Sequence, residues 1–207
     1  MPVWPSTPFA GNTVSACPTL TTERLILRPF EESDLDAYTA IVTSPEVRAA
    51  LHLPDGFSRA DAWIDMAKWL GQWELRGTGQ WAVVDKSGGT LLGRAGLNLP
   101  ERPDWPGIEV GWTMDPKQWG HGYANEVATC AVEYGFDVVG ADGLFSVILP
   151  ENTRSIAVAM RLGFTFVEER VMAHFSEMPH GIWRLGRDEW QPWPERPAVT
   201  KPSPSGR

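Results

Sequence analysis

The chain has 207 residues, a formal net charge of −8, 43% hydrophobic residues and 21% charged residues. This length and composition are typical of one globular domain with tails. The acidic charge argues against nucleic acid as a main partner, because phosphate binding requires a basic face, and it suits cationic substrates such as amines. No apolar run is long enough to span a bilayer, and the N-terminus lacks the pattern of a signal peptide. Cys17 and Cys130 make no disulfide framework, so we expect a cytoplasmic protein.

The two ends of the chain differ from its middle. Residues 1–19 and 191–207 are rich in Pro together with small and polar residues, which predicts tails without regular structure. One folded domain is therefore expected over residues 20–190.

The first part of the folded region predicts a strand, two helical regions and a hairpin. The strand begins at Leu25 and ends at Pro29, and a helix follows it to about residue 42. A second helical region begins at Ser58, with apolar residues at spacings of three and four. The hairpin is formed by strands 80–85 and 90–99 around a Gly-Gly turn.

The second part predicts alternating strands and helices. In order they are strand 108–114, helix 123–137, strand 144–149, a helix from Asn152 to Leu162, and strands 164–175 and 181–185. The whole order is β-αα-βββ-α-β-α-ββ. It predicts an α/β (α+β) fold with a mixed, mostly antiparallel sheet of about seven strands, flanked by about four helices.

The loop between strand 108–114 and helix 123–137 contains the sequence W-G-H-G-Y-A at 119–124. Its glycines let successive N–H groups point to one place, and the following helix adds free N–H groups and a positive end. The loop therefore predicts a phosphate or pyrophosphate site, with an ordinary Gly-rich turn as the alternative. A P-loop is excluded because its Lys is missing, and a dinucleotide fingerprint is excluded because Asn125 takes its last place.

Three blocks of the sequence together resemble the GNAT (Gcn5-related N-acetyltransferase) superfamily. L-T-T-E-R-L-I-L-R-P at 20–29 resembles its opening strand, most closely in the branch that acetylates ribosomal-protein N-termini. W-G-H-G-Y-A resembles its pyrophosphate loop R/Q-x-x-G-x-G/A, with Trp119 in the Arg/Gln place. N-T-R-S at 152–155 and R-L-G-F at 161–164 resemble its N-x-x-S…L-G-F segment. The resemblance implies a GNAT-like fold and transfer of an acetyl group from acetyl-CoA to a primary amine.

The resemblance also implies where acetyl-CoA binds. In this family it lies where two parallel strands splay apart, here strands 108–114 and 144–149. Backbone groups of Trp112, Thr113 and Met114 are expected to pair with the pantetheine arm, and Asn152 to hydrogen-bond it as well as capping a helix. The residues expected at the pyrophosphate are Trp119, Gly120, His121, Gly122, Tyr123 and Ala124.

Two residues are candidates for catalysis. Glu109 is the candidate base, because a carboxylate inside an apolar strand is costly unless it is paired or working; an edge position or an ion pair is the alternative. The N–H of Met114 is expected to polarise the thioester carbonyl. Ser155 is the candidate acid for the leaving thiolate, since Ala159 replaces the Tyr that many relatives use. A plain capping or core-facing hydroxyl is the alternative, and a thiol with a pKa of about 8.5 can leave without an acid.

The acceptor amine stays open between a protein N-terminus, a polyamine, an amino acid and an amino-bearing antibiotic. It is expected to enter between residues 46–75 and 164–185. Candidate lining residues are Trp63, Trp69, Trp73, Trp105 and His174. Two other functions compete: a non-catalytic acyl-CoA-binding or sensing module, and a nucleotide-binding protein. A homodimer stays open, whereas no nucleic acid, membrane or metal partner is expected.

Overall fold

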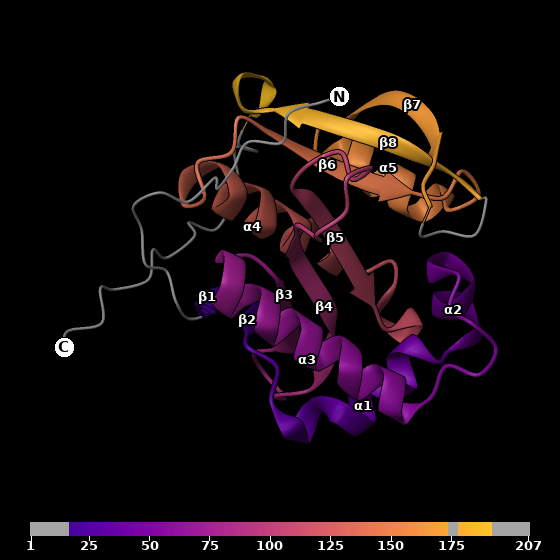
Figure 1. The fold of residues 1–207 in the computed structure, drawn as a ribbon. Coiled ribbons are helices and arrows are strands. Elements are labelled where there is room, and N and C mark those ends of the chain that lie inside the picture. The colour runs from indigo at the N-terminus through magenta and orange to yellow at the C-terminus, as the bar shows by residue number, and fades with distance from the viewer. Residues whose placement is uncertain (1–16, 174–177, 192–207) are drawn as a thin grey trace.

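The structure is a computed structural model, and it describes residues 17–173 and 178–191 (Figure 1). Within these residues the chain forms one eight-stranded sheet and five α-helices. The strands are β1 (Leu20–Thr21), β2 (Leu25–Arg28), β3 (Gln80–Asp85), β4 (Leu91–Asn98), β5 (Glu109–Met114), β6 (Gly143–Ile148), β7 (Thr165–Val171) and β8 (Pro179–Gly186). The helices are α1 (Leu35–Val42), α2 (Pro45–Leu51), α3 (Arg59–Arg76), α4 (Tyr123–Asp137) and α5 (Thr153–Arg161).

The predicted mixed, mostly antiparallel sheet with flanking helices is confirmed. Two short elements add to the predicted order. Strand β1 has two residues, and α2 has seven, which begin at Pro45 and end at the left-handed residue His52. Neither is long enough to show a hydrophobic period. The strand predicted over 164–175 ends earlier, at Val171, and the predicted tails at 1–16 and 192–207 lie outside the described residues.

The strand order in the sheet is β1-β2-β3-β4-β5-β6-β8-β7. All neighbours are antiparallel except β5 and β6, which run parallel because the crossover through α4 returns the chain in the same direction. This parallel pair has a single registered residue pair, Glu109 with Phe145. Strands β5 and β6 therefore meet at one end and separate toward the other.

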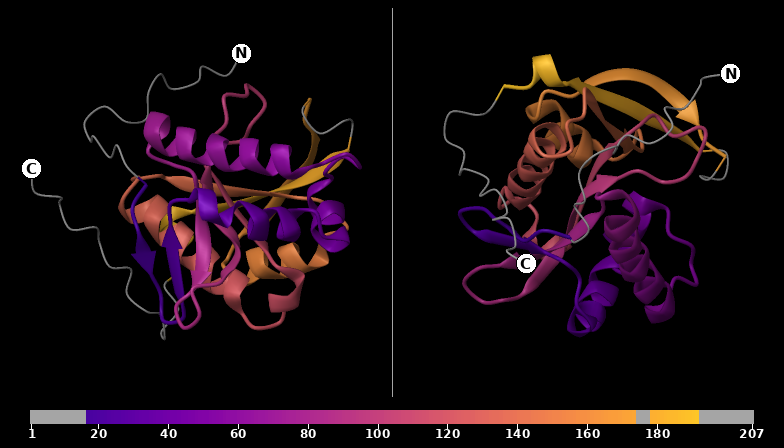
Figure 2. Two further views of the ribbon diagram at one scale, coloured as in Figure 1. Left: turned by 90° about the horizontal axis from the view of Figure 1, so that it is seen from below. Right: turned by 60° about the vertical axis from the view of Figure 1, so that its left-hand side comes forward.

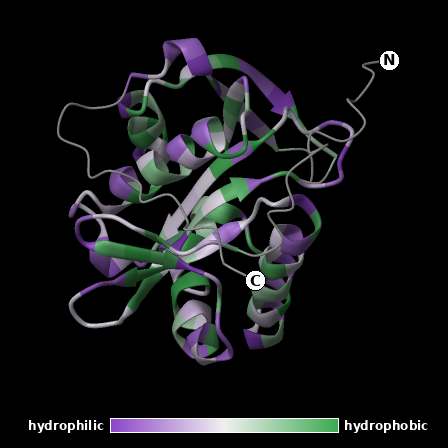
Figure 3. Cartoon of the chain, turned by 90° about the vertical axis from the view of Figure 1, so that its left-hand side faces the viewer, coloured by the Kyte–Doolittle hydropathy of each residue, from purple (hydrophilic) through white to green (hydrophobic). Residues whose placement is uncertain are grey.

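Helices cover both faces of the sheet (Figure 2). Helices α1 to α3 lie on one face, where Tyr38, Met66 and Trp69 pack with Ala82 and Val84. Helices α4 and α5 lie on the other face, against the larger core cluster. Figure 3 shows mostly pale and green strands in the middle of the sheet, with hydrophilic residues in several turns and helical segments and in a strand at the top of the view. The period of two along the strands thus supplies two cores, one on each face.

Three large aromatic rings pack together at the side of strand β3. The ring centroids of Trp73 and Trp81 are 4.6 Å apart, and those of Trp81 and Tyr134 are 5.2 Å apart. Trp73 comes from α3 and Tyr134 from α4, so this cluster joins helices of both layers. All three side chains are almost fully buried.

We predict that Trp81→Ala lowers the free energy of unfolding by about 3–5 kcal/mol, because it leaves a cavity between the two layers. Trp63→Ala is the matched control, since Trp63 is 48% exposed. This control is expected to change the free energy by less than about 1 kcal/mol. Urea unfolding followed by far-UV circular dichroism measures both. Equal effects in the two variants would contradict the structural role of the cluster.

Candidate active site

The separation of β5 and β6 begins at a side-chain hydrogen bond. The backbone N–H of Phe145 donates to Ile108 O at 2.9 Å, as in a regular parallel pair. One residue further, the buried Ser146 hydroxyl donates to Val110 O at 3.1 Å. Beyond Val110 the described residues contain no further β5–β6 pairing. The edge of β5 at residues 112–114 is therefore open toward β6.

The glycine loop lies at the end of this open edge. Gly120 and Gly122 have φ angles of +83° and +82°, a left-handed conformation that suits glycine. Gly122 is the N-cap of α4, so the free N–H groups of that helix begin directly after the loop. The Trp119 indole N–H donates to Met114 O at 3.0 Å and ties the loop to the end of β5.

Arg24 holds the outer side of the same loop. Its Nη1 donates to His121 O at 3.0 Å, and its Nε donates to Glu126 Oε2 at 2.8 Å. The guanidinium also lies over the Tyr123 ring, at 4.4 Å from the centroid. The T-T-E-R-L block thus contacts the loop about a hundred residues later, a connection that the sequence pattern does not show.

A cavity of about 710 Å³ lies along the open edge and the loop. The predicted residues that line it are Trp112, Thr113, Met114, Trp119, Gly120, Gly122, Tyr123, Ala124 and Asn152. His121 is the exception, because its ring is exposed and its carbonyl faces Arg24. Arg154 and Arg161 also line this cavity, and Arg154 lies 4.5 Å from the Trp119 ring centroid. Sequence reasoning assigned no role to either cation.

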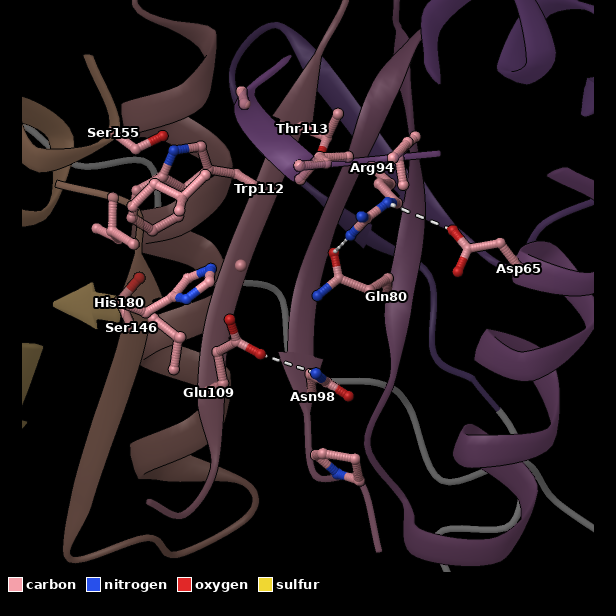
Figure 4. Close-up of a pocket in the computed structure, with 18 of the residues that line it drawn as sticks. Asp65, Gln80, Arg94, Asn98, Glu109, Trp112, Thr113, Ser146, Ser155 and His180 are labelled. Atoms are coloured by element: carbon pink, nitrogen blue, oxygen red, sulfur yellow. Dashed lines mark hydrogen bonds and ion pairs between the residues drawn. The ribbon is translucent and has the colours of Figure 1, made fainter. Parts of the chain in front are cut away.

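A second cavity, of about 290 Å³, lies on the sheet face that α1 to α3 cover. Glu109 lines it and accepts a hydrogen bond of 2.8 Å from Asn98 Nδ2 (Figure 4). Burial raises the pKa of Glu109, although the bond from Asn98 opposes this shift. His180, which sequence reasoning missed, lines the same cavity, and burial lowers its pKa. The cavity therefore contains a carboxyl and an imidazole that both favour their neutral forms.

The two cavities meet at the centre of β5. Trp112, Thr113, Asn152 and Ser155 line both of them. Asn152 is a helix cap, since its Oδ1 accepts from Ser155 N at 3.1 Å, and it faces the cavities as well. A group bound along β5 at this junction is accessible from both sides.

The aromatic residues predicted to line the acceptor site separate into three groups. Trp69 and Trp105 line the second cavity. Trp73 belongs to the core cluster and Trp63 lies on the outer side of α3, so neither reaches the cavity. His174 lies outside the described residues. A helical spacing of three and four does not separate the two sides of α3, because tryptophans occupy both.

Within residues 17–173 and 178–191, no group of three or more His, Cys, Asp or Glu side chains is arranged to hold a metal ion. The helices in the same residues are all too short or too polar to cross a membrane.

Comparison with known proteins gives the family. Residues 24–165 match the model of the acetyltransferase (GNAT) domain. The chain is 29% identical over 203 residues to the FsC-acetyl coenzyme A-N(2)-transacetylase of Aspergillus fumigatus. This match covers 91% of this chain and 84% of that protein. An acetyltransferase structure from Agrobacterium tumefaciens shares 28% identity with a TM-score of 0.73, covering 86% of this chain and 100% of that one.

A structure described as a putative ribosomal-protein-serine acetyltransferase from Vibrio cholerae has the same fold. Its TM-score is 0.65 at 19% identity, and the match covers 81% of this chain and 97% of that one. The family model spans the open strand edge, the glycine loop and most of both cavities. The chain therefore belongs to the GNAT acetyltransferase family and is an acetyl-CoA-dependent acyltransferase.

Proposed function

We propose that this protein transfers an acetyl group from acetyl-CoA to a primary amine by direct attack in a ternary complex. One observation carries the proposal: two cavities meet at residues 112 and 113 of an open strand edge. The larger cavity has a strand edge, a glycine loop and two cations, which suits a long anionic thioester. The smaller one contains the Glu109 carboxyl, which suits an amine.

The larger cavity offers a partner for each part of the CoA molecule. The backbone of Trp112 to Met114 pairs with the pantetheine amides in the manner of an added strand. The N–H groups of the loop 119–124 bind the pyrophosphate, and Arg154 adds positive charge beside them. Asn152 Nδ2 donates to the pantetheine arm, while its Oδ1 keeps the helix cap.

In the reaction the amine nitrogen bonds to the thioester carbon and the carbon–sulfur bond breaks. Glu109 accepts the proton that the amine loses, directly or through a water molecule. The pKa of Glu109 is raised toward the pKa of an α-amine, which is about 7.7–8.0. The free energy needed to move the proton from the amine to Glu109 is therefore smaller. The Met114 N–H polarises the carbonyl, and Ser155 Oγ donates a proton to the thiolate.

Thiol release from acetyl-CoA, followed with a thiol reagent against a panel of amines and N-terminal peptides, tests the proposal. Release that depends on an acceptor is expected. Tight acetyl-CoA binding without release from any acceptor would instead identify a binding or sensing module.

We predict that Gly120→Ala and Gly122→Ala each weaken acetyl-CoA binding. A side chain at positive φ costs about 1–2 kcal/mol, and the loop escapes this cost by leaving the conformation that binds phosphate. The dissociation constant from calorimetry is expected to rise about 5- to 30-fold.

Gly140→Ala is the matched control for the loop. Gly140 also has a positive φ, of +78°, and open space around its Cβ position, but it lies outside both cavities. Its substitution is expected to cost similar stability and to leave acetyl-CoA binding unchanged. Weakened binding in this control would show that the loop variants act through general destabilisation.

We predict that Glu109→Gln lowers kcat about 10²- to 10⁴-fold, the usual contribution of a general base, and leaves acetyl-CoA binding unchanged. In the unmodified protein kcat/KM rises with pH through the raised pKa of Glu109. In the variant, kcat/KM is expected to lose the increase with pH that Glu109 causes. Only the increase caused by deprotonation of the acceptor amine is expected to remain. Steady-state rates between pH 5 and 9 measure both effects, and undiminished rates would sink the base assignment.

We predict that Ser155→Ala lowers kcat about 10²-fold, near the lower end for a general acid. The helix cap uses the backbone N–H of Ser155, so alanine preserves it. Thermal unfolding at an unchanged temperature would confirm that the fold is intact. An unchanged kcat would mean that the thiolate leaves without help from this hydroxyl.

A further inference from the structure

The second cavity is lined by charged side chains at the end away from Glu109. Asp65 and Lys68 on α3 and Arg94 on β4 line it together. The Lys68 side chain is 54% exposed, whereas the Arg94 side chain is only 12% exposed, so Arg94 is the buried cation of this group. Burying a charge is costly unless another charge or a set of hydrogen bonds compensates it, so the partners of Arg94 determine whether an anion can bind here.

Asp65 does not fully compensate Arg94, because closer groups already use both of its oxygens. Oδ2 accepts from the Tyr38 hydroxyl at 2.5 Å and from the Trp69 indole at 3.1 Å, and Oδ1 binds Lys68 at 2.5 Å. Arg94 comes only to 3.8 Å, and its Nε has no hydrogen-bond partner among the described residues. Although burial opposes it, Arg94 and Lys68 together hold the pKa of Asp65 below its usual value.

Arg94 is nevertheless held firmly in place. Its side chain is 12% exposed and lies over the Trp69 ring, at 5.1 Å from the centroid. Its Nη1 donates to Gln80 Oε1 at 3.0 Å, which turns the Gln80 amide nitrogen toward the cavity (Figure 4). A fixed guanidinium loses little further freedom when it binds a ligand.

Two more polar groups lie next to Arg94 on the same sheet face. Thr113 pairs with Arg94 across β4 and β5, and its buried hydroxyl has no hydrogen-bond partner among the described residues. Gly111 follows on that face, and a Cβ there would lie 3.2 Å from Gln80 Nε2. The glycine therefore leaves the Gln80 amide accessible from the cavity.

We propose that the acceptor carries a carboxylate in addition to its primary amine, and that this carboxylate binds to Arg94, Gln80 and Thr113. The inference rests on the proposed function and specifies its substrate class. A guanidinium, an amide N–H and a hydroxyl are donors that suit a planar carboxylate. The cavity has Glu109 at one end and Arg94 at the other, which matches the opposite charges of an amino-carboxylate (Figure 4).

The test compares acceptors that differ only in the carboxylate. One pair is a free amino acid and its carboxamide, with the α-amine kept in both. The other is a short N-terminal peptide with Glu or Gln at its second position. The carboxylate member of at least one pair is expected to have a kcat/KM roughly 10- to 100-fold higher, the usual effect of a hydrogen bond to a charged group. The pair that responds identifies the source of the carboxylate.

Arg94→Gln is expected to bring this ratio close to one, and Arg94→Lys is expected to restore part of it, because lysine keeps the charge but loses the planar fork. Removing a partly buried cation also costs stability. The fraction of folded protein is the same for both acceptors in one variant, so it cancels in the ratio of their kcat/KM values. A change in this ratio therefore reports acceptor recognition and not stability. Arg59→Gln is the matched control, since Arg59 pairs with Asp36 outside the cavity. Its ratio is expected to stay unchanged.

Equal rates for both members of both pairs would overturn the inference and leave the proposed acetyl transfer intact. A ratio that persists in Arg94→Gln would overturn the assignment to Arg94. Acetyl-CoA binding without thiol release from any acceptor would overturn the proposed function and the inference with it.

Discussion

The separation of β5 from β6 is the constraint on which the rest of the site depends. A parallel pair is held by evenly spaced backbone bonds, and here the Ser146 hydroxyl takes the place of the next one. Beyond this point no backbone group of β5 pairs with β6 in the described residues, and Met114 O accepts from the Trp119 indole instead. The glycine loop, the first turn of α4 and the cap of α5 all lie around this opening, and both cavities meet beside it.

Local charge in this protein differs from its total charge. The chain is acidic overall, with a net charge of −8, and that total suggested cationic acceptors. The larger cavity is nevertheless lined by Arg154 and Arg161, and the smaller one by Arg94 and Lys68 beside Asp65. The net charge of the chain says little about the potential at a site formed by a few side chains. At such a site, the potential depends on the nearest charges and on their burial.

Patterns within one element predicted much of the fold and many of the residues that line the larger cavity. The length of α4 and the β3–β4 hairpin each follow from a local period or turn. Contacts between distant elements did not. The Arg24 bond to the loop, the Arg94–Asp65 pair and the burial of Trp73 depend on how helices pack on the sheet. Single-residue patterns carry no information on such pairings.

The raised pKa of Glu109 links the proposed catalytic base to folding. A carboxyl whose pKa is higher in the native state than in the unfolded chain binds its proton more tightly when folded. Its contribution to stability is therefore complete at low pH. It is lost as the pH rises from the unfolded value of about 4.3 through the raised native value. The ionised form of Glu109, which the proposed reaction requires, is the less stable form, so ionising this carboxyl costs folding free energy.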